Sequence, residues 1–313
     1  MLQSAASRTS TISPFHMRDT EISHQAAPDF SGISAETLIV RLAKTPEDLL
    51  AAQKLRYHVF YEELGAVPTP DMATHKKDWD AYDAFCDHIL VIDTQDPSSA
   101  MDAASQQTVV HDGKVIGTYR VLLADAAKKA AIPLYTQTEF DLSKLLQTPG
   151  VRVMETSRSC VFLPYRNGII VSMLWQAIST YAFHYQVSHL IGIPSFHGTA
   201  VAPYMDALAS LHAYSKAPAV ICPTPLRTLR MPLEAHEIAI PNTPLLQPTD
   251  HDAVPALIKG YLKLGAQIGD GVVIDHQFNT VDLCIIVDIT NQKNTLVSYF
   301  RKKYERHLQI QAI

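Results

Sequence analysis

The chain has 313 residues, of which 47% are hydrophobic, so it is long enough to form one large domain with a sizeable core. Its formal net charge of -5 argues against a protein that binds nucleic acid mainly through phosphate contacts. The four cysteines are widely spaced and form no C-x-x-C pair, which argues against a disulfide framework or a zinc site and favours a reducing, cytoplasmic setting.

The N-terminal part predicts a tail, a strand and a helix. Residues 1–36 are rich in Ser, Thr, Ala and His without periodicity, which is typical of a disordered tail. Residues 37–43 predict a strand, and 45–63 predict a helix that opens with an N-cap threonine, a proline and two acids. Arg56 and Phe60 lie four residues apart and therefore share a face of this helix. For Arg56, a solvated helix charge is the common alternative to a site residue.

An acidic and aromatic loop follows between residues 65 and 85. Aromatic side chains stand between its aspartates, among them Asp80 and Asp83, and they predict a loop anchored on the body of the protein. Anchored carboxylates are suited to bind the amino groups of a cationic substrate. Residues 88–93 predict a second strand, and the polar segment 94–107 predicts a flexible insertion.

Two further strands and a short helix lead to the middle of the chain. Residues 108–123 predict a hairpin with an Asp-Gly turn, and Arg120 lies within its second strand. A short helix is predicted at 139–147. Apolar and polar residues then alternate over 151–161, which predicts a strand.

The strand at 151–161 carries two charges, Glu155 and Arg158, that a buried strand ordinarily avoids. An isolated charge inside a sheet is costly, so such residues are usually paired, functional or both. Residues three apart on a regular strand point to opposite faces, whereas a β-bulge between them brings both side chains to one site. We therefore predict that this strand is central to the active site and that a bulge turns Glu155 and Arg158 toward Asp80 and Asp83.

The rest of the chain predicts helices and strands separated by a proline-rich surface connection. Predicted helices occupy 169–185, 202–212 and 254–264, and predicted strands occupy 187–193, 272–275 and 281–288. Residues 293–313 predict a basic amphipathic helix, for which contact with anionic lipid and packing on its own domain are both open. No uninterrupted apolar run reaches the ~18 residues of a membrane-spanning helix.

Covalent catalysis is not indicated by any motif. The chain contains no G-x-S-x-G nucleophile elbow. Cys160, although it follows the charged strand residues, is better explained as a packed core thiol.

Several collinear motifs carry a specific family resemblance. They are Leu55-Arg-Tyr-His-Val-Phe-Tyr-Glu-Glu63, Asp78-Trp-Asp-Ala-Tyr-Asp-Ala-Phe-Cys-Asp-His88, Ile116-Gly-Thr-Tyr-Arg-Val-Leu-Leu123, Glu139-Phe-Asp-Leu142, Glu155-Thr-Ser-Arg-Ser-Cys160, Pro255-Ala-Leu-Ile-Lys-Gly-Tyr-Leu-Lys-Leu-Gly-Ala266 and Gly269-Asp-Gly-Val-Val-Ile-Asp275. With these motifs the chain resembles the bacterial L-ornithine N(alpha)-acyltransferase family of ornithine-lipid synthesis. That family is related to the acyl-homoserine-lactone synthases and has the GNAT fold.

The resemblance implies both a fold and a reaction. The fold is an α/β GNAT-type domain over 37–292, a mixed twisted sheet flanked by helices with a splayed, bulged central strand. The reaction is transfer of a 3-hydroxyacyl group from acyl carrier protein to the α-amine of L-ornithine, which gives lyso-ornithine lipid. The enzyme then needs no cofactor of its own and no metal, because phosphopantetheine arrives on the carrier protein. The implied setting is the cytoplasm, with peripheral contact to the inner face of the membrane as an option.

The resemblance also implies a set of site residues. The expected catalytic residues are Glu155, as the general base, and Arg158. Substrate binding is expected from residues before the central strand, namely Arg56, Phe60, Asp80, Asp83 and Arg120. Acyl-donor binding is expected from residues at its end and in the following turn, namely Cys160, Arg166, Asn167 and Gly168. This turn departs from the Q/R-x-x-G-x-G/A pattern that holds a pyrophosphate, which fits a donor without a nucleotide.

Two other functions remain open from the sequence. One is a signal synthase, similar to the lactone synthases, that uses S-adenosylmethionine. The other is a non-catalytic lipid- or carrier-binding protein with a GNAT fold. For the charged residues themselves, an ion-pair network that ties the acidic loop to the sheet is the structural alternative.

Overall fold

The computed structural model describes residues 26–95, 108–226 and 245–311. Part of the predicted tail, 1–36, belongs to the folded body, because Phe30 and Ile33 are buried in the core and Ser34–Ala35 forms the first strand. The rest of that tail, up to residue 25, lies outside the described residues. The predicted insertion, 94–107, lies outside them from residue 96 onward.

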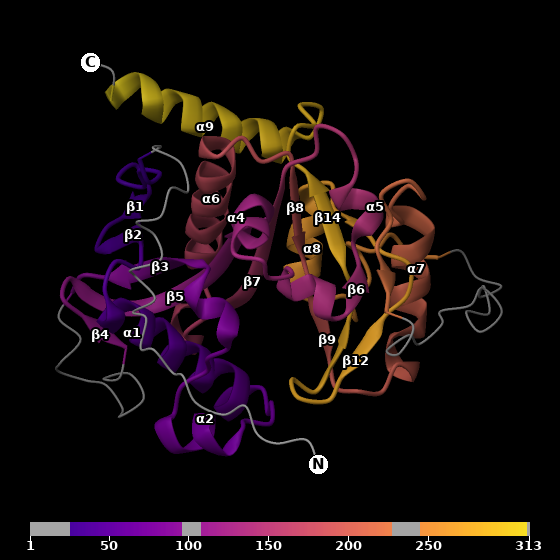
Figure 1. The fold of residues 1–313 in the computed structure, drawn as a ribbon, viewed down its shortest axis with the longest axis horizontal. Helices are drawn as coiled ribbons and strands as arrows, with labels where there is room; N and C mark the ends of the chain where they lie inside the picture. Colours follow the sequence, from indigo (N-terminus) through magenta and orange to yellow (C-terminus); the bar gives the residue numbers. More distant parts are fainter. Residues whose placement is uncertain (1–25, 96–107, 227–244, 312–313) are drawn as a thin grey trace, which may run out of the picture.

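A mixed sheet forms the centre of the molecule (Figure 1). Its neighbouring strands follow the order β1-β2-β3-β5-β7-β8-β14-β11, and β4 pairs with β5. Within the described residues, all neighbours pair antiparallel except β7 and β8, which are parallel. The strands are β1 (Ser34–Ala35), β2 (Leu38–Leu42), β3 (Asp87–Asp93), β4 (Val109–Val110), β5 (Gly113–Leu123), β7 (Val153–Val161), β8 (His189–Gly192), β11 (Gln267–Ile268) and β14 (Ile285–Asp288).

Helices connect and cover these strands. The α-helices are α1 (Pro46–Tyr57), α2 (Pro70–His75), α4 (Ala124–Lys129), α5 (Ser143–Leu146), α6 (Ile169–His184), α7 (Met205–Ser215), α8 (Ala256–Lys263) and α9 (Thr295–Gln311). A π-helical segment, η2 (His58–Glu63), continues α1, and short 3-10 turns form η3 (Ala81–Ala84), η5 (Tyr135–Thr138), η6 (Leu163–Tyr165) and η7 (Ala202–Tyr204).

The two faces of the central strands are covered by different helices. On one face, the rings of Tyr119 in β5 and Trp175 in α6 lie 6.5 Å apart. The next residue of β5, Arg120, shares the Asp83 carboxylate with Arg56 of α1. Because successive side chains of a strand point to opposite faces, α6 and α1 lie on opposite sides of β5. The predicted mixed sheet flanked by helices is thus confirmed.

Two short sheets complete the described structure beyond β8. One consists of β12 (Val273–Asp275), β13 (Thr280–Asp282) and β9 (Ser195–His197), all antiparallel. The other pairs β10 (Thr224–Pro225) with β6 (Phe140–Asp141). The first of these lies beyond the ends of β8 and β14 (Figure 1).

Two predicted elements differ from the structure. The single strand predicted at 281–288 is divided into β13 and β14, because the first half pairs with β9 and the second half pairs with β8. The helix predicted at 139–147 is shorter, since residues 140–141 form β6 and only Ser143–Leu146 is helical. In both cases the strand partner comes from a distant part of the chain, which local periodicity does not reveal.

The predicted bulge is present in β7, slightly later than expected. Thr118 faces Cys160 and Arg120 faces Ser157, so Arg158 and Ser159 together oppose the single residue Tyr119. The pairing from Glu155 to Ser157 is regular. Arg158 has a φ of 54°, in the left-handed region that a side chain other than glycine seldom adopts. The bulge therefore lies at Arg158–Ser159 and not between Glu155 and Arg158.

The parallel strands β7 and β8 pair only over their first residues. Their contacts run from Val153 with His189 to Glu155 with Ile191. At Gly192 the two backbones are so close that a Cβ atom would lie 2.7 Å from the carbonyl oxygen of Thr156. After Gly192 the chain turns away toward β9, so the second half of β7 has no partner on this side among the described strands.

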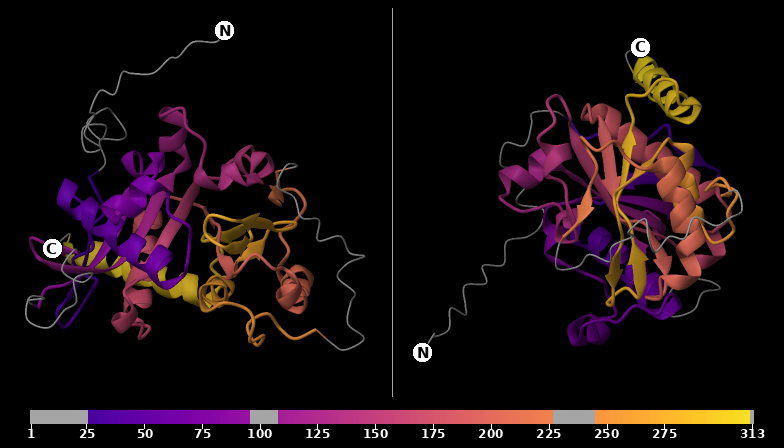
Figure 2. Two further views of the ribbon diagram at one scale, coloured as in Figure 1. Left: turned by 90° about the horizontal axis from the view of Figure 1, so that it is seen from below. Right: turned by 90° about the vertical axis from the view of Figure 1, so that its right-hand side faces the viewer.

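The predicted C-terminal helix is α9, which lies across the end of α6 at the outside of the molecule (Figure 1, Figure 2). Val297 and Phe300 are buried, and the Arg301 guanidinium lies 4.4 Å from the ring centroid of Phe183 in α6. Its apolar face therefore packs on its own domain. Among the described helices, none is both long and apolar enough to cross a membrane.

The close approach at Gly192 can be tested by substitution. Gly192→Ala places a methyl group against the Thr156 carbonyl and should lower the free energy of unfolding by about 1–3 kcal/mol in urea titration. Gly260→Ala is the matched control, because its added Cβ atom meets only ordinary contacts with Trp175 at 3.8 Å and favours helix α8. Equal stability of the two variants would contradict the proposed constraint.

Candidate active site

Three arginines and three aspartates form a buried ion network between the acidic loop and the sheet. Arg56 comes from α1, Arg120 from β5 and Arg158 from the bulge of β7. Asp78, Asp80 and Asp83 come from the segment between α2 and the end of η3. We call these six residues the ion network.

Arg56 lies at the centre of the acidic loop. Its side chain is completely buried, and its Nε lies 2.7 Å from Oδ2 of Asp78. Its Nη1 and Nη2 donate to the two oxygens of Asp83 at 3.0 and 2.7 Å. Nη2 also donates to the backbone carbonyl of Asp78 at 2.7 Å. The alternative of a solvated helix charge is thus excluded for Arg56.

Arg120 and Arg158 tie the same loop to the sheet. Nη1 of Arg120 lies 2.6 Å from Asp80 and 2.9 Å from Asp83, and its Nε donates to the hydroxyl of Ser157 at 3.0 Å. Arg158 lies 3.1 Å from Asp80 and 3.4 Å from Asp78. Every aspartate of the network therefore contacts two arginines.

The arginines keep the aspartates ionised despite their burial. Burial alone raises the pKa of Asp83, but Arg56 and Arg120 outweigh it and hold that pKa below the usual range. The pKa of Asp80 is lowered in the same way by Arg120 and Arg158. Removing one partner from such a buried set leaves an uncompensated charge and typically costs about 3–5 kcal/mol of stability.

The structure brings five of the eleven predicted site residues together. It joins Arg56, Asp80, Asp83, Arg120 and Arg158 in one network. Asp78 was missed, although it stands in the same acidic run. Because Asp80 and Asp83 are held by arginines, their carboxylates are already neutralised, which favours a role in positioning the loop and Arg158.

Arg158 is the member of the network that reaches a cavity. A cavity of about 270 Å³ opens where β7 leaves β8, and Ser157, Arg158 and Ser159 form part of its wall. The guanidinium of Arg158 lies between two aromatic rings, 4.8 Å from the centroid of Tyr135 and 4.7 Å from that of Phe278. Such stacking fixes the plane of the guanidinium, and the ion pairs with Asp78 and Asp80 occupy part of its edge.

Phe60 contributes an apolar wall to the same cavity. Its ring meets that of Phe278 edge-on, with centroids 5.8 Å apart. Tyr119 and Tyr261, whose hydroxyl groups contact each other, also line the cavity. The Tyr261 hydroxyl lies 3.0 Å from Oγ1 of Thr156. The cavity thus combines an apolar wall with polar groups on β7.

Glu155 lies beneath this site and anchors a neighbouring turn. Its side chain is only 2% exposed. Its carboxylate accepts hydrogen bonds from the backbone N–H groups of Tyr135, at 2.9 Å, and Thr136, at 2.6 Å. Burial nevertheless raises the pKa of Glu155. Both carboxylate oxygens are therefore engaged at the start of η5, whose first residue, Tyr135, stacks on Arg158.

The residues predicted for the acyl donor lie at the far end of β7. Cys160 is buried opposite Thr118, and burial raises the pKa of its thiol. Arg166 donates to the carbonyl of Val161 at 2.8 Å and pairs with Glu63. Asn167 accepts from the N–H of Ile169, and Gly168 precedes α6 with a φ of 88°. The guanidinium of Arg166 is thus already held by the protein.

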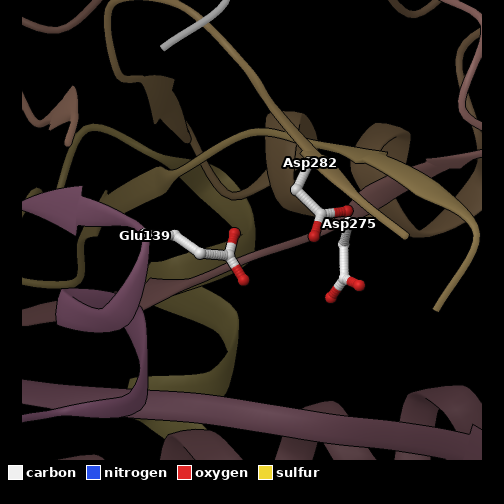
Figure 3. A group of neighbouring side chains, drawn as sticks. All are labelled: Glu139, Asp275 and Asp282. Atoms are coloured by element: carbon white, nitrogen blue, oxygen red, sulfur yellow. The ribbon is translucent and has the colours of Figure 1, made fainter. Parts of the chain in front are cut away.

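A cluster of three carboxyl groups, absent from the sequence prediction, lines the cavity away from the ion network. Glu139 follows η5, Asp275 ends β12 and Asp282 ends β13. One carboxylate oxygen from each lies within 4.8 Å of the other two (Figure 3). We call these residues the acidic cluster. Burial and the neighbouring carboxylates raise the pKa of Glu139 to about 8, and burial with Asp275 raises that of Asp282 to about 6.

The acidic cluster was missed because its members are far apart in the sequence. Glu139 and Asp275 were noticed only as ends of family motifs, and Asp282 stood inside a predicted strand. Of the described residues, these three form the group whose donor atoms are close enough to hold a cation. Pairing of β12 with β13 brings Asp275 and Asp282 together, whereas Glu139 comes from the segment between η5 and β6.

Comparison with known proteins fits this geometry. Residues 55–176 match a family model described as the acetyltransferase (GNAT) domain. The match, together with the splayed sheet and the cavity at its bulge, defines an acyltransferase of the GNAT class.

Two curated relatives give the family. An L-ornithine N(alpha)-acyltransferase of Agrobacterium fabrum is 34% identical over 286 residues, which cover 90% of this chain and 92% of that protein. Another from Rhizobium meliloti is 36% identical over 266 residues, which cover 84% of each. The chain belongs to the L-ornithine N(alpha)-acyltransferase family. A solved N-acyl amino acid synthase from uncultured soil microbes, FeeM, covers 84% of this chain and 96% of its own at 11% identity, with a TM-score of 0.41.

The raised pKa of Glu139 predicts a pH-dependent stability. A carboxyl whose pKa is higher in the folded state stabilises the fold at low pH, and this contribution is lost as pH rises from about 4.5 to about 8. Between pH 5 and pH 8 the wild type should lose about 2–4 kcal/mol more unfolding free energy than Glu139→Gln, which cannot ionise. Urea titrations at both pH values measure the difference, and parallel curves would contradict the burial of a neutral carboxyl.

Proposed function

We propose that this protein transfers a 3-hydroxyacyl group from acyl carrier protein to the α-amine of L-ornithine, the first step of ornithine-lipid synthesis. The observation that supports this most is the cavity at the bulge of β7, where the parallel strands separate and Arg158 forms part of the wall. Donor and acceptor can meet there without crossing the sheet. Family membership supplies the class of reaction and the acceptor.

The transfer is direct, without an acyl-enzyme. All four cysteines are free and buried, and burial raises the pKa of Cys160, so its thiol stays protonated. The acceptor amine attacks the thioester carbonyl, the new C–N bond forms, and the C–S bond breaks. The proton released by the amine leaves with the carrier-protein thiolate, so that one amide and one thiol result.

The donor lies along the open edge of β7. From Thr156 onward this edge has no partner among the described strands, so its backbone N–H groups are placed to polarise a thioester carbonyl. The turn before α6 is a poor pyrophosphate site, because the Arg166 guanidinium is held by Val161 and Glu63. Both features favour phosphopantetheine on a carrier protein over a nucleotide-bearing donor. The enzyme then requires no cofactor of its own.

The acceptor is oriented by Arg158. The guanidinium, fixed between Tyr135 and Phe278, is suited to hold the α-carboxylate of an amino acid. Catalysis then depends mainly on orientation and on the polarised carbonyl. The ion network acts by holding Arg158 and the acidic loop in place.

The donor and acceptor suggest where the protein acts. Both are cytoplasmic metabolites in this proposal, and the acylated product is a lipid. The outer side of α9 exposes Tyr299 and Ile310 beside Lys302 and Lys303, so we propose that α9 contacts the inner face of the membrane.

A substrate comparison tests the proposed reaction. Purified protein should acylate ornithine with a 3-hydroxyacyl carrier protein at least ten times faster than with the matching coenzyme A thioester. This ratio corresponds to a difference of about 1.4 kcal/mol in activation free energy. Mass spectrometry of the product identifies the amide. Release of methylthioadenosine from S-adenosylmethionine would favour a signal synthase instead, and carrier binding without turnover of any amine would favour a non-catalytic protein.

The role of Glu155 can be tested by Glu155→Gln. We propose that Glu155 positions Tyr135 and therefore Arg158, whereas the sequence predicted a general base. The glutamine keeps one acceptor oxygen but turns an N–H donor toward a backbone N–H, which costs about 1–3 kcal/mol. A positioning role predicts a roughly tenfold or larger loss of kcat/KM with an unchanged pH–rate profile.

The pH–rate profile distinguishes the two roles. Loss of its acidic limb in Glu155→Gln would show that Glu155 is the base. Undiminished transfer in a folded variant would contradict both roles. Glu305→Gln, on the exposed face of α9, is the control and should match the wild type.

A further inference from the structure

The acidic cluster lies in the acceptor cavity but has no part in the chemistry described so far. Arg158 and the cluster line the same cavity, so the walls carry a cation from β7 and three carboxyl groups, one just after η5, one on β12 and one on β13. Within the described structure, Arg158 forms its ion pairs with Asp78 and Asp80 and not with the cluster. A cation that enters the cavity could therefore neutralise the cluster.

An unpartnered oxygen in the cluster points to a missing ligand. The Glu139 side chain is 8% exposed, and its Oε2 has no hydrogen-bond partner among the described residues. Its carboxyl group extends toward those of Asp275 and Asp282 (Figure 3). A buried carboxyl oxygen without a donor is costly, so a donor that enters the cavity is expected to bind it.

We propose that Glu139, Asp275 and Asp282 form the subsite that holds the side-chain ammonium of the amino-acid acceptor. The inference rests on the proposed function, and it assigns the residues that select a diamino acid. An acceptor with its α-carboxylate on Arg158 then spans the cavity, and its distal ammonium enters the acidic cluster. The α-amine stays beside the bulge, where the thioester carbonyl is polarised.

The oxygens of the acidic cluster are close enough together for one ammonium group to contact all three. Each oxygen lies within 4.8 Å of the other two, so a nitrogen between them can lie about 2.8 Å from each, which is a charge-assisted N–H···O distance. An ammonium group has three N–H donors, one for each carboxylate. The same spacing admits a divalent metal ion, whose oxygen ligands lie closer, so the experiment must distinguish the two occupants.

The experiment compares ornithine with norvaline, which has the same carbon chain but lacks the distal amine. The wild type should prefer ornithine by about 100-fold or more in kcat/KM, because norvaline leaves the carboxylates unpartnered. In Glu139→Gln and Asp282→Asn this preference should fall at least about tenfold. Asp270→Asn is the control, because Asp270 pairs with Lys216 at 3.0 Å outside the cavity wall. Thermal unfolding establishes that each variant is folded.

The remaining outcomes of this experiment distinguish the alternatives to an ammonium subsite. An unchanged preference in folded cluster variants, or an equal loss with both amino acids, would overturn the subsite. Loss of ornithine transfer on adding EDTA, with recovery on adding magnesium or calcium, would show that the cluster is a metal site instead. If the wild type acylates neither amino acid, the proposed function fails, and isothermal titration of ornithine and norvaline still decides whether the cluster binds the distal ammonium.

Discussion

The site depends on one buried guanidinium, that of Arg158, at a strained position of the central strand. A left-handed φ costs a residue with a side chain roughly 1–2 kcal/mol, so the surroundings must hold it there. Ion pairs with Asp78 and Asp80 and two aromatic rings supply that stabilisation. The bulge interrupts regular pairing with β5 in the half of β7 that β8 has left, which creates the cavity.

The charged residues of the site form two groups, the ion network and the acidic cluster. Arg158 of the ion network lines the same cavity as the acidic cluster. The ion network combines three arginines with three aspartates and is therefore formally neutral. It fastens the acidic loop to the sheet and holds Arg158 at the cavity. Among the described residues no cation forms an ion pair with the acidic cluster, so its carboxyl groups are destabilised as anions, which agrees with the raised pKa of Glu139. The field that an acceptor meets is consequently set by the cluster and by Arg158 together.

Local pattern was sufficient for most elements and for part of the site. The helix at 45–63, the hairpin at 108–123 and the bulged strand were predicted because periodicity, capping and turn residues are local properties. Arg120 and Arg158 were selected as site residues because a charged side chain is unusual in the predicted strand that carries each of them, and Arg56 was selected by the family resemblance. Pairing of Asp80 and Asp83 with these arginines was one of the alternatives that the sequence left open. The anchoring contact of Glu155 with η5 was not predicted, because it joins segments that are far apart in the chain.

By itself, the sequence determined the fold class, the family and the presence of an irregular charged strand, because each of these depends on residues that are contiguous in the chain. The tertiary structure alone decided which charges neutralise one another and which face a cavity. It placed Glu139, between η5 and β6, beside Asp275 and Asp282 of the paired strands β12 and β13, which are more than a hundred residues away in the sequence. The physical reason is that the burial and charge of a carboxyl group depend on its neighbours in space, which its neighbours in sequence do not specify.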